Sequence, residues 1–218
     1  MQLTMMLNTN VIMKEKEEIN TEQAILEAAE KEFLDKGYAL TKTTEIAKIA
    51  GVNHAMLHYY FRTKENLFNQ VFQKKMSILI ASFATKVDEE LPFTEKIRFI
   101  VEEHFNFLAE NPKLPFFILS EFITNKERLD KLCDMATPEI SGFVDKIKTE
   151  VNDEIAKGNI APIDPFNLIL DIVSLNVFAF LAHPLVEKVT ESIGKDYQAF
   201  IEQRRDENVL VILRRLQT

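Results

Sequence analysis

The chain has 218 residues, a formal net charge of −8, 46% hydrophobic residues and 28% charged residues. This composition is typical of a soluble globular protein, and the length allows a small domain joined to a larger one. Five isolated glycines exclude a glycine-rich phosphate-binding loop, and the single cysteine, Cys133, excludes an internal disulfide bond and favours a reducing compartment.

The N-terminal end does not have the pattern of a signal peptide. Residues 1–13 are uncharged and lack a basic start, so we predict a disordered extension over residues 1–19. The most apolar internal stretch, residues 168–182, contains Asp171 and is too short to cross a bilayer. We therefore expect a cytoplasmic protein without membrane contact.

Helical periodicity dominates the chain, and no alternating strand pattern stands out. In chain order, the N-terminal part is expected to form helices from Asn20 to Lys36, from Thr43 to Ile49 and from His54 to Tyr60, followed by a long helix that Thr63 caps and that runs toward Val87. The first three helices would form a domain over residues 20–63.

Prolines punctuate the remainder, which we assign to one helical domain over residues 64–218, with residues 64–88 as the connecting helix. Its further helices are predicted at residues 93–109, 113–124, 126–136, 138–157, 165–182, 185–193 and 195–215. The expected fold class is all-α, a three-helix head followed by a helical bundle.

Residues 43–60 have the features of a helix-turn-helix, in which two short helices are joined by a tight turn and the second can enter the major groove of DNA. Ala47 is small where the two helices must cross, and Gly51 allows a positive φ at the turn. Leu57 and Phe61 would bury the second helix against the first helix of the domain.

The charge distribution agrees with a DNA-binding head. Residues 36–75 carry seven Lys and Arg against two acids, or +5, whereas residues 76–218 carry sixteen against twenty-four, or −8. A basic segment joined to an acidic body is expected when one module meets phosphate and the other does not.

The run TTEIAKIAGVNHAMLHYYFRTKENLF resembles the N-terminal domain of the tetracycline-repressor (TetR) family, over about residues 20–70. That family typically shows a Thr-led helix, then IA..AGV, then L-aromatic-x-aromatic-F..K..L. Asn53, Ala55 and His58 stand where the family usually has Ser, Gly and Tyr. Asn53 can still cap the second helix, so these departures bear on which operator is read.

The resemblance implies two groups of DNA contacts beside the cap at Asn53. The base-edge readers would be Thr44, His54, Ala55, Met56 and His58, and the phosphate contacts would be Thr43, Tyr59, Tyr60 and Lys64. A solvent-exposed bystander is the alternative for His58. Tyr59 and Tyr60 are adjacent and cannot share one helix face, so packing is the alternative for that pair.

The second domain holds the candidate effector site. Thirteen of the seventeen phenylalanines lie beyond residue 75, and ligand pockets are mostly apolar with a few polar groups. The candidate ligand-binding residues are His104, Phe105, Phe117, Glu121 and Phe143. His104 lies on an apolar helix stripe and could orient the ligand, or it could be a hydrogen-bonded core histidine. For Glu121 the alternative is a solvated carboxylate.

Residues 166–182 are apolar nearly all round, so a helix there must be buried on more than one side. Together with the last helix, residues 197–215, the family resemblance implies half of a dimerising four-helix interface. An intramolecular helix pair is the alternative.

Enzyme motifs such as H-E-x-x-H, G-x-S-x-G and the P-loop are missing, so we expect no enzyme activity, no catalytic residues and no cofactor. His54 and His58 have a spacing that could bind a metal, but DNA reading is the preferred interpretation and we expect no metal. The sequence predicts a homodimeric transcriptional repressor released from a palindromic double-stranded DNA operator by a small apolar effector. The alternative is a helical ligand-binding or scaffold protein whose head no longer binds DNA.

Overall fold

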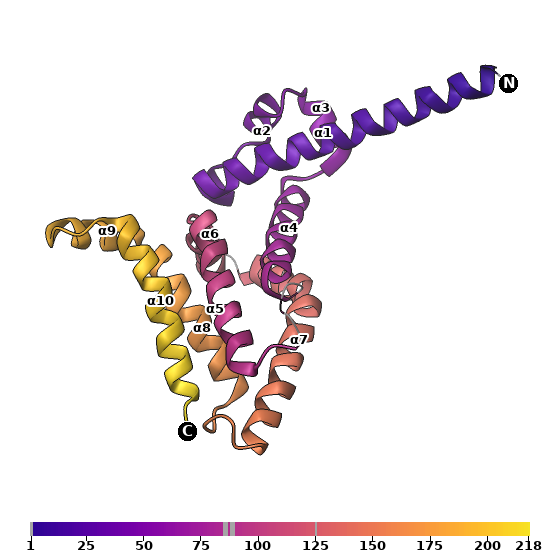
Figure 1. Ribbon diagram of the computed structural model, residues 1–218. Helices are drawn as coiled ribbons and strands as arrows, with labels where there is room; N and C mark the ends of the chain where they lie inside the picture. Colours follow the sequence, from indigo (N-terminus) through magenta and orange to yellow (C-terminus); the bar gives the residue numbers. More distant parts are fainter. Residues whose placement is uncertain (1, 85–86, 88–89, 125) are drawn as a thin grey trace. The chain divides into compact units, whose positions relative to one another are not determined.

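The computed structural model describes the backbone of residues 2–84, 87, 90–124 and 126–218. The described residues form helices and connecting turns without a strand, which confirms the all-α prediction. The helices are α1 (Gln2–Leu40), α2 (Thr43–Ile49), α3 (His54–Phe61), α4 (Lys64–Ala84), α5 (Phe93–Glu110), α6 (Leu114–Thr124), α7 (Lys126–Ala156), α8 (Pro165–Leu181), α9 (His183–Ser192) and α10 (Tyr197–Leu216), as labelled in Figure 1.

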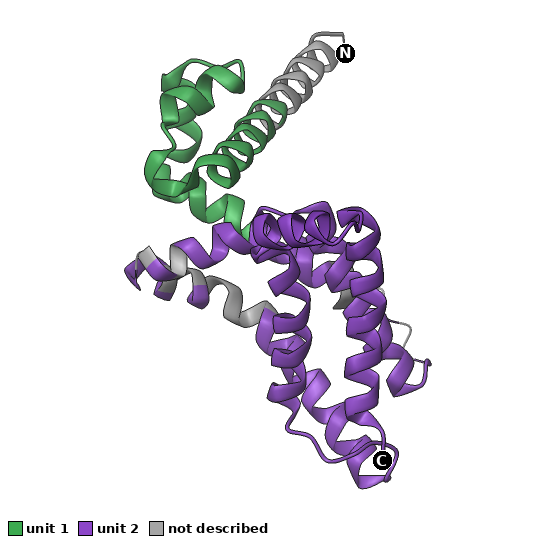
Figure 2. Ribbon diagram, turned by 90° about the vertical axis from the view of Figure 1, so that its left-hand side faces the viewer, with its two compact units in different colours: residues 1–74 green, residues 75–218 purple. Residues whose placement is uncertain are grey.

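The chain divides into two compact units, Met1–Lys74 and Lys75–Thr218, coloured green and purple in Figure 2. The division falls inside α4, whereas the sequence predicted it after residue 63. The reason is that Leu67 and Phe68, in the first part of α4, are fully buried. Phe68 meets the ring of Phe33 edge-on at 5.2 Å, so the first turns of α4 complete the core of the first unit.

Helix α1 begins at Gln2 rather than near Asn20, and the backbone of residues 2–19 is helical where the sequence predicted disorder. This stretch contains neither glycine nor proline, and its run KEKEE consists of strong helix formers. The side chains of residues 1–19 lie outside the described part. Near its end α1 is interrupted at Gly37, whose φ of 72° is open to glycine at little cost.

The core of the second unit lies among α5, α7, α8 and α10. Helix α5 packs against α8 and α10, and α7 packs against α8. The buried side chains at the centre are mainly aliphatic and include Ile97, Val101, Val151, Leu168 and Ile212. This core holds in place the helices that carry the candidate ligand-binding residues.

Two predicted helix boundaries in the second unit are wrong. Helix α7 is continuous over Lys126–Ala156, so Pro138 does not break it. A proline removes one backbone donor, and burial of Ile147 and Val151 on the same helix offsets that loss. Helix α9 begins at His183 instead of residue 185, with a proline in its first turn, a position that suits the fixed φ of proline.

Among the described residues, no single helix combines the length and apolarity needed to span a bilayer. The α8–α9 pair meets those criteria only when the two helices are taken together, and they are bent by 70°.

Candidate nucleic-acid interface and ligand cavity

The helix-turn-helix is built by local hydrogen bonds and by burial of one face of α3. The Asn53 side chain accepts a bond of 2.8 Å from the amide of Met56 and so caps α3, as predicted. In the turn, Gly51 has a φ of 70°. Leu57 and Phe61 are fully buried, so α3 is fixed by one face and leaves its other face open.

The open face of α3 carries four of the five side chains predicted to read bases, and the fifth, Thr44, is exposed on α2. The exposed residues of α3 are His54, Ala55, Met56, His58 and Tyr59. Tyr59 is 74% exposed, and its ring meets that of the half-buried Tyr60 edge-on at 5.3 Å. Of the two tyrosines, Tyr59 is therefore the more accessible to a partner.

The two histidines of α3 form an ordered pair. The hydroxyl of Thr43 lies 2.9 Å from Nε2 of His54, and the rings of His54 and His58 meet edge-on at 4.5 Å. Nδ1 of His58 lies 2.9 Å from the carbonyl oxygen of Arg62. Since a carbonyl only accepts, Nδ1 of His58 carries the proton, and in the neutral ring Nε2 is an acceptor.

The ammonium group of Lys64 lies 4.3 Å from the centre of the Tyr38 ring. This cation–π contact offsets the unfavourable position of a cation in the first turn of α4. Thr63 caps the same helix, because its hydroxyl accepts a bond of 3.0 Å from the amide of Asn66. Both interactions orient the start of α4 beside the reading helix.

One of the basic residues of the head is engaged in ion pairs between α1 and α2. The Lys36 amine lies 2.6 Å from Glu32 and 2.9 Å from Glu45. Hydrogen bonds to these carboxylates raise the pKa of Lys36, and the Lys36 bond lowers the pKa of Glu45. Lys36 is thus paired with two carboxylates of the head and is not a candidate for a phosphate contact.

Sequence reasoning missed Arg62, the exposed residue that follows α3. Its φ of 59° is in a region that few residues other than glycine adopt. Its carbonyl holds His58, and its guanidinium adds a positive charge next to the reading helix. The sequence carried no signal for this conformation.

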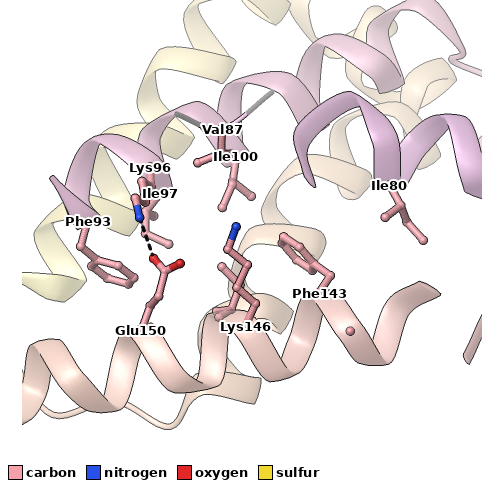
Figure 3. Close-up of a pocket in the computed structure, with 11 residues that line it drawn as sticks. Ile80, Val87, Phe93, Lys96, Ile97, Ile100, Phe143, Lys146 and Glu150 are labelled. Carbon is pink, nitrogen blue, oxygen red and sulfur yellow. Dashed lines mark hydrogen bonds and ion pairs between the residues drawn. The ribbon is translucent and has the colours of Figure 1, made fainter. Parts of the chain in front are cut away.

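The second unit contains a cavity of about 260 Å³ between α5 and α7 (Figure 3). Its wall is mostly apolar but includes Lys96, Lys146 and Glu150. A smaller space of about 40 Å³ lies next to it and has His104 in its wall. Four residues line both spaces: Ile97, Ile100, Phe143 and Ile147.

The predicted ligand residues are only partly brought together. Phe143 lines both spaces and His104 lines the smaller one. Phe105 and Phe117 are buried but line neither of these two spaces, and Phe105 packs against Phe180 at 5.0 Å. The side chain of Glu121 lies outside the described residues.

His104 belongs to a buried polar chain across three helices. The Asn176 amide donates bonds of 3.1 Å to Nδ1 of His104 and 2.9 Å to the carbonyl of Val101. The Asn208 amide in turn donates a bond of 2.9 Å to the side-chain oxygen of Asn176. Burial lowers the pKa of His104 to about 4, so the ring is neutral near pH 7. The core-histidine interpretation agrees with this geometry.

The helices predicted to dimerise have one buried and one open face. On α8 the buried face includes Leu168, Ile172 and Asn176. The exposed apolar side chains of α8, α9 and α10 include Phe166, Leu170, Val173, Phe178, Leu185, Val189, Leu210 and Val211. Exposed apolar surface on consecutive helices is characteristic of an interaction surface.

Comparisons with known proteins agree with this architecture. Residues 25–71 match the family model described as bacterial regulatory proteins, tetR family. The chain is 29% identical over 185 residues to the HTH-type transcriptional regulator RutR of Escherichia coli strain K12, which covers 83% of each protein.

Solved structures share the fold over most of the chain. A Clostridium perfringens protein assigned as a fatty acid metabolism regulator is 25% identical, with a TM-score of 0.69 over 89% of this chain and 99% of that one. The transcriptional regulator FadR of Bacillus subtilis, in complex with stearoyl-CoA, is 21% identical, with a TM-score of 0.61 over 86% and 97% of the two chains. The second likeness concerns the fold alone.

Proposed function

We propose that this chain, whose residues 25–71 match the model of the TetR family of bacterial regulatory proteins, is a transcriptional repressor that an effector releases from DNA. The observation that carries the proposal is the exposed row on α3. A helix capped by Asn53 and buried through Leu57 and Phe61 presents His54 and Tyr59 outward. A buried back and a polar, aromatic front suit a helix that lies in the major groove.

The contacts at the DNA divide by chemistry. His54 and the small Ala55 at the start of α3 would meet base edges, since a ring nitrogen can hydrogen-bond and a methyl group can contact thymine. Thr43, Tyr59 and Lys64 would meet phosphates, which fix the position on DNA without selecting sequence. We add Arg62 to this second group on account of its exposure.

We further propose that two copies pair through the exposed apolar side chains of α8 and α10. A dimer would present two α3 helices to the two halves of a palindromic operator. Phe166 and Phe178 are each 63% exposed on α8, and covering them would supply the apolar area that a stable pair needs.

The effector would enter the second unit. Ile80 of α4 lines the cavity, while Leu67 and Phe68 of the same helix are buried in the first unit. A ligand that contacts Ile80 therefore touches the helix that connects the units, and it would favour one of two states of the protein. The assignment of the Clostridium perfringens protein to fatty acid metabolism supports a largely apolar effector.

A gel-shift experiment with a pool of genomic fragments, including the DNA that flanks the protein's own gene, tests the proposal. We expect a small set of fragments to be retained and to compete with one another at moderate salt. If no fragment is retained above the affinity of random DNA, the alternative of a ligand-binding or scaffold protein without DNA binding replaces the proposal.

A further inference from the structure

The backbone at Arg62, directly after α3, has a strained conformation. Arg62 has a φ of 59° and a ψ of −51°, and the amide of Thr63 donates a bond of 2.6 Å to the carbonyl of Phe61. These values and this bond define a γ-turn of the rare, strained kind. Such backbone persists only where its surroundings hold it, and it is concentrated at functional sites.

Neighbouring groups hold this turn in place. The ring of Phe61 is fully buried, and its carbonyl also accepts a bond of 3.1 Å from the side-chain amide of Asn66. The backbone amide of Asn66 in turn donates a bond of 3.0 Å to the hydroxyl of Thr63. The turn is therefore anchored to the end of α3 on one side and to the first turn of α4 on the other.

The turn directs the Arg62 carbonyl at His58, because the ψ of a residue sets the direction of its carbonyl. The carbonyl oxygen lies 2.9 Å from Nδ1 of His58 and can only accept, so Nδ1 carries the hydrogen and Nε2 of the neutral ring keeps a lone pair. His58 is exposed, and within the described part of the chain no hydrogen bond engages its Nε2. His58 thus presents a hydrogen-bond acceptor to a partner.

We propose that His58 reads an exocyclic amino group in the major groove, N6 of adenine or N4 of cytosine, and that Arg62 is the residue that positions it. These two amino groups are the hydrogen-bond donors that base pairs present in that groove. Guanine and thymine present oxygen acceptors there, which would face the lone pair of Nε2 without a hydrogen between them. The inference rests on the proposed function.

The place of His58 on α3 agrees with base reading. His54, to which we assign a base contact, lies one helical turn earlier on the same open face, and the two ring centres are 4.5 Å apart. Four residues of a helix advance it by about 6 Å. His54 and His58 would therefore meet bases close to each other in the same groove.

Gel shifts at pH 8, where histidine side chains are ordinarily neutral, test the base assignment with an operator from the fragment pool. Each operator position is changed to the other three bases. We expect the wild-type protein to prefer adenine or cytosine about tenfold at one position of each half-site, and His58→Phe to lose this preference. Tyr59→Phe is the matched control, because loss of a phosphate contact should lower affinity for all bases alike.

Base analogues test the amino group itself and show which base carries it. Purine in place of that adenine, or 2-pyrimidinone in place of that cytosine, removes the amino group and keeps the ring. The change should weaken binding by the wild type about tenfold more than binding by His58→Phe, which corrects for altered base pairing. A preference for guanine or thymine that depends on His58 would overturn the proposal. Unchanged discrimination in His58→Phe would make His58 a bystander and leave the proposed function standing.

Two variants that remove the same guanidinium test the positioning by Arg62. Glycine adopts a positive φ at little cost, whereas a β-branched residue is strained there. We therefore expect Arg62→Gly to keep the discrimination that depends on His58 and Arg62→Val to reduce it, with circular dichroism melting to check that both fold. Equal discrimination by the two variants would overturn the positioning role.

The tautomer of His58 can be measured without DNA. Long-range ¹H–¹⁵N correlation spectra of the full-length protein at pH 8, with His58 assigned by comparison with His58→Phe, should show hydrogen on Nδ1 in the wild type and in Arg62→Gly. In Arg62→Val the two tautomers should be mixed. Hydrogen on Nε2 in the wild type would overturn the proposal even if DNA is bound. Retention of no DNA fragment would remove the proposed function and the base contact, and hydrogen on Nδ1 would still support the positioning by Arg62.

Discussion

The hydroxyl of Thr43 and Nε2 of His54 lie 2.9 Å apart, so the first residue of α2 orients the first residue of α3. His54 is also in contact with the ring of His58, which is itself bonded to the Arg62 carbonyl. The imidazole is thus ordered before any partner arrives. Ordering a side chain in advance reduces the conformational entropy lost on binding.

The Thr43–His54 pair should therefore influence base preference. His54→Ala is expected to reduce discrimination at one base pair of each half-site by about 1–3 kcal/mol. Thr43→Val keeps the shape but removes the hydroxyl, and it should reduce the same discrimination by a smaller amount. Gel shifts with the operator and its single-base variants measure both. Thr94→Val, at an exposed position of α5, is the control, and an undiminished base preference in His54→Ala would show that His54 does not read DNA.

Lys64 should contribute equally to the affinity for all DNA sequences. We expect Lys64→Ala to lower affinity uniformly and to reduce the slope of log affinity against log salt by about 1, as is typical for loss of one phosphate contact. Loss of the contact with Tyr38 should also cost about 0.5–1 kcal/mol of stability, which thermal melting would detect. Lys157→Ala, in the second unit, should keep the wild-type slope, and an unchanged slope in Lys64→Ala would contradict the phosphate contact.

A charge at Phe178 should separate the proposed dimer. This side chain is 63% exposed on α8, so Phe178→Glu leaves the core intact but places a carboxylate in the apolar contact. Sedimentation at micromolar concentration should show monomers with much weaker operator binding. Val177 is half-buried, so a charge at this position would lower the stability of the monomer as well as weaken dimerisation. Phe178 is therefore the better choice. Gln203→Glu, at an exposed position of α10, is the control for the effect of an added negative charge on dimerisation. A wild-type protein that sediments as a monomer would refute the dimer.

Acid should destabilise the second unit through His104. Burial lowers the pKa of this residue from about 6.5 to about 4, so the unfolded chain binds the proton first as the pH falls. The contribution to stability is complete above pH about 6.5 and is lost between 6.5 and 4, a change on the order of 3 kcal/mol. Urea unfolding across this range measures the slope.

His104→Leu should flatten that pH dependence because it removes the imidazole that titrates. The Asn176 amide keeps its bond to the Val101 carbonyl, so the variant should still fold. Val189→Leu, at an exposed position of α9, should retain the wild-type slope and serves as the control. A wild-type slope in His104→Leu would assign the acid sensitivity to other groups.

The head could be predicted from the sequence because its features are local. The turn at Gly51 and the caps at Asn53 and Thr63 join residues within a few positions of each other. The period of the apolar residues also identified Leu57 and Phe61 as the buried face of α3. Local propensity and helical spacing are sufficient where neighbours in sequence are neighbours in space.

Of the predicted ligand-binding residues that the structure describes, Phe143 lines the cavity between α5 and α7, and His104 lines the smaller space beside it. Aromatic content indicated Phe105 and Phe117, which line neither space, while Lys96 and Lys146 were not selected. Periodicity shows which side of a helix is apolar, but it does not show which neighbouring helix covers that side. A lysine whose stem lies along an apolar wall has no distinct pattern in the sequence.

By itself the sequence determined the all-helical class, the position of the helix-turn-helix and the resemblance to the TetR family, because these depend on short-range spacing and a continuous motif. Only the tertiary structure decided that the first turns of α4 belong to the head, that α7 continues through Pro138, and that His104 bonds to Asn176, 72 residues away. Such outcomes depend on which helix faces pack together. The packing of helix faces depends on burial and hydrogen bonding summed over the whole unit. A short segment of sequence does not contain that information.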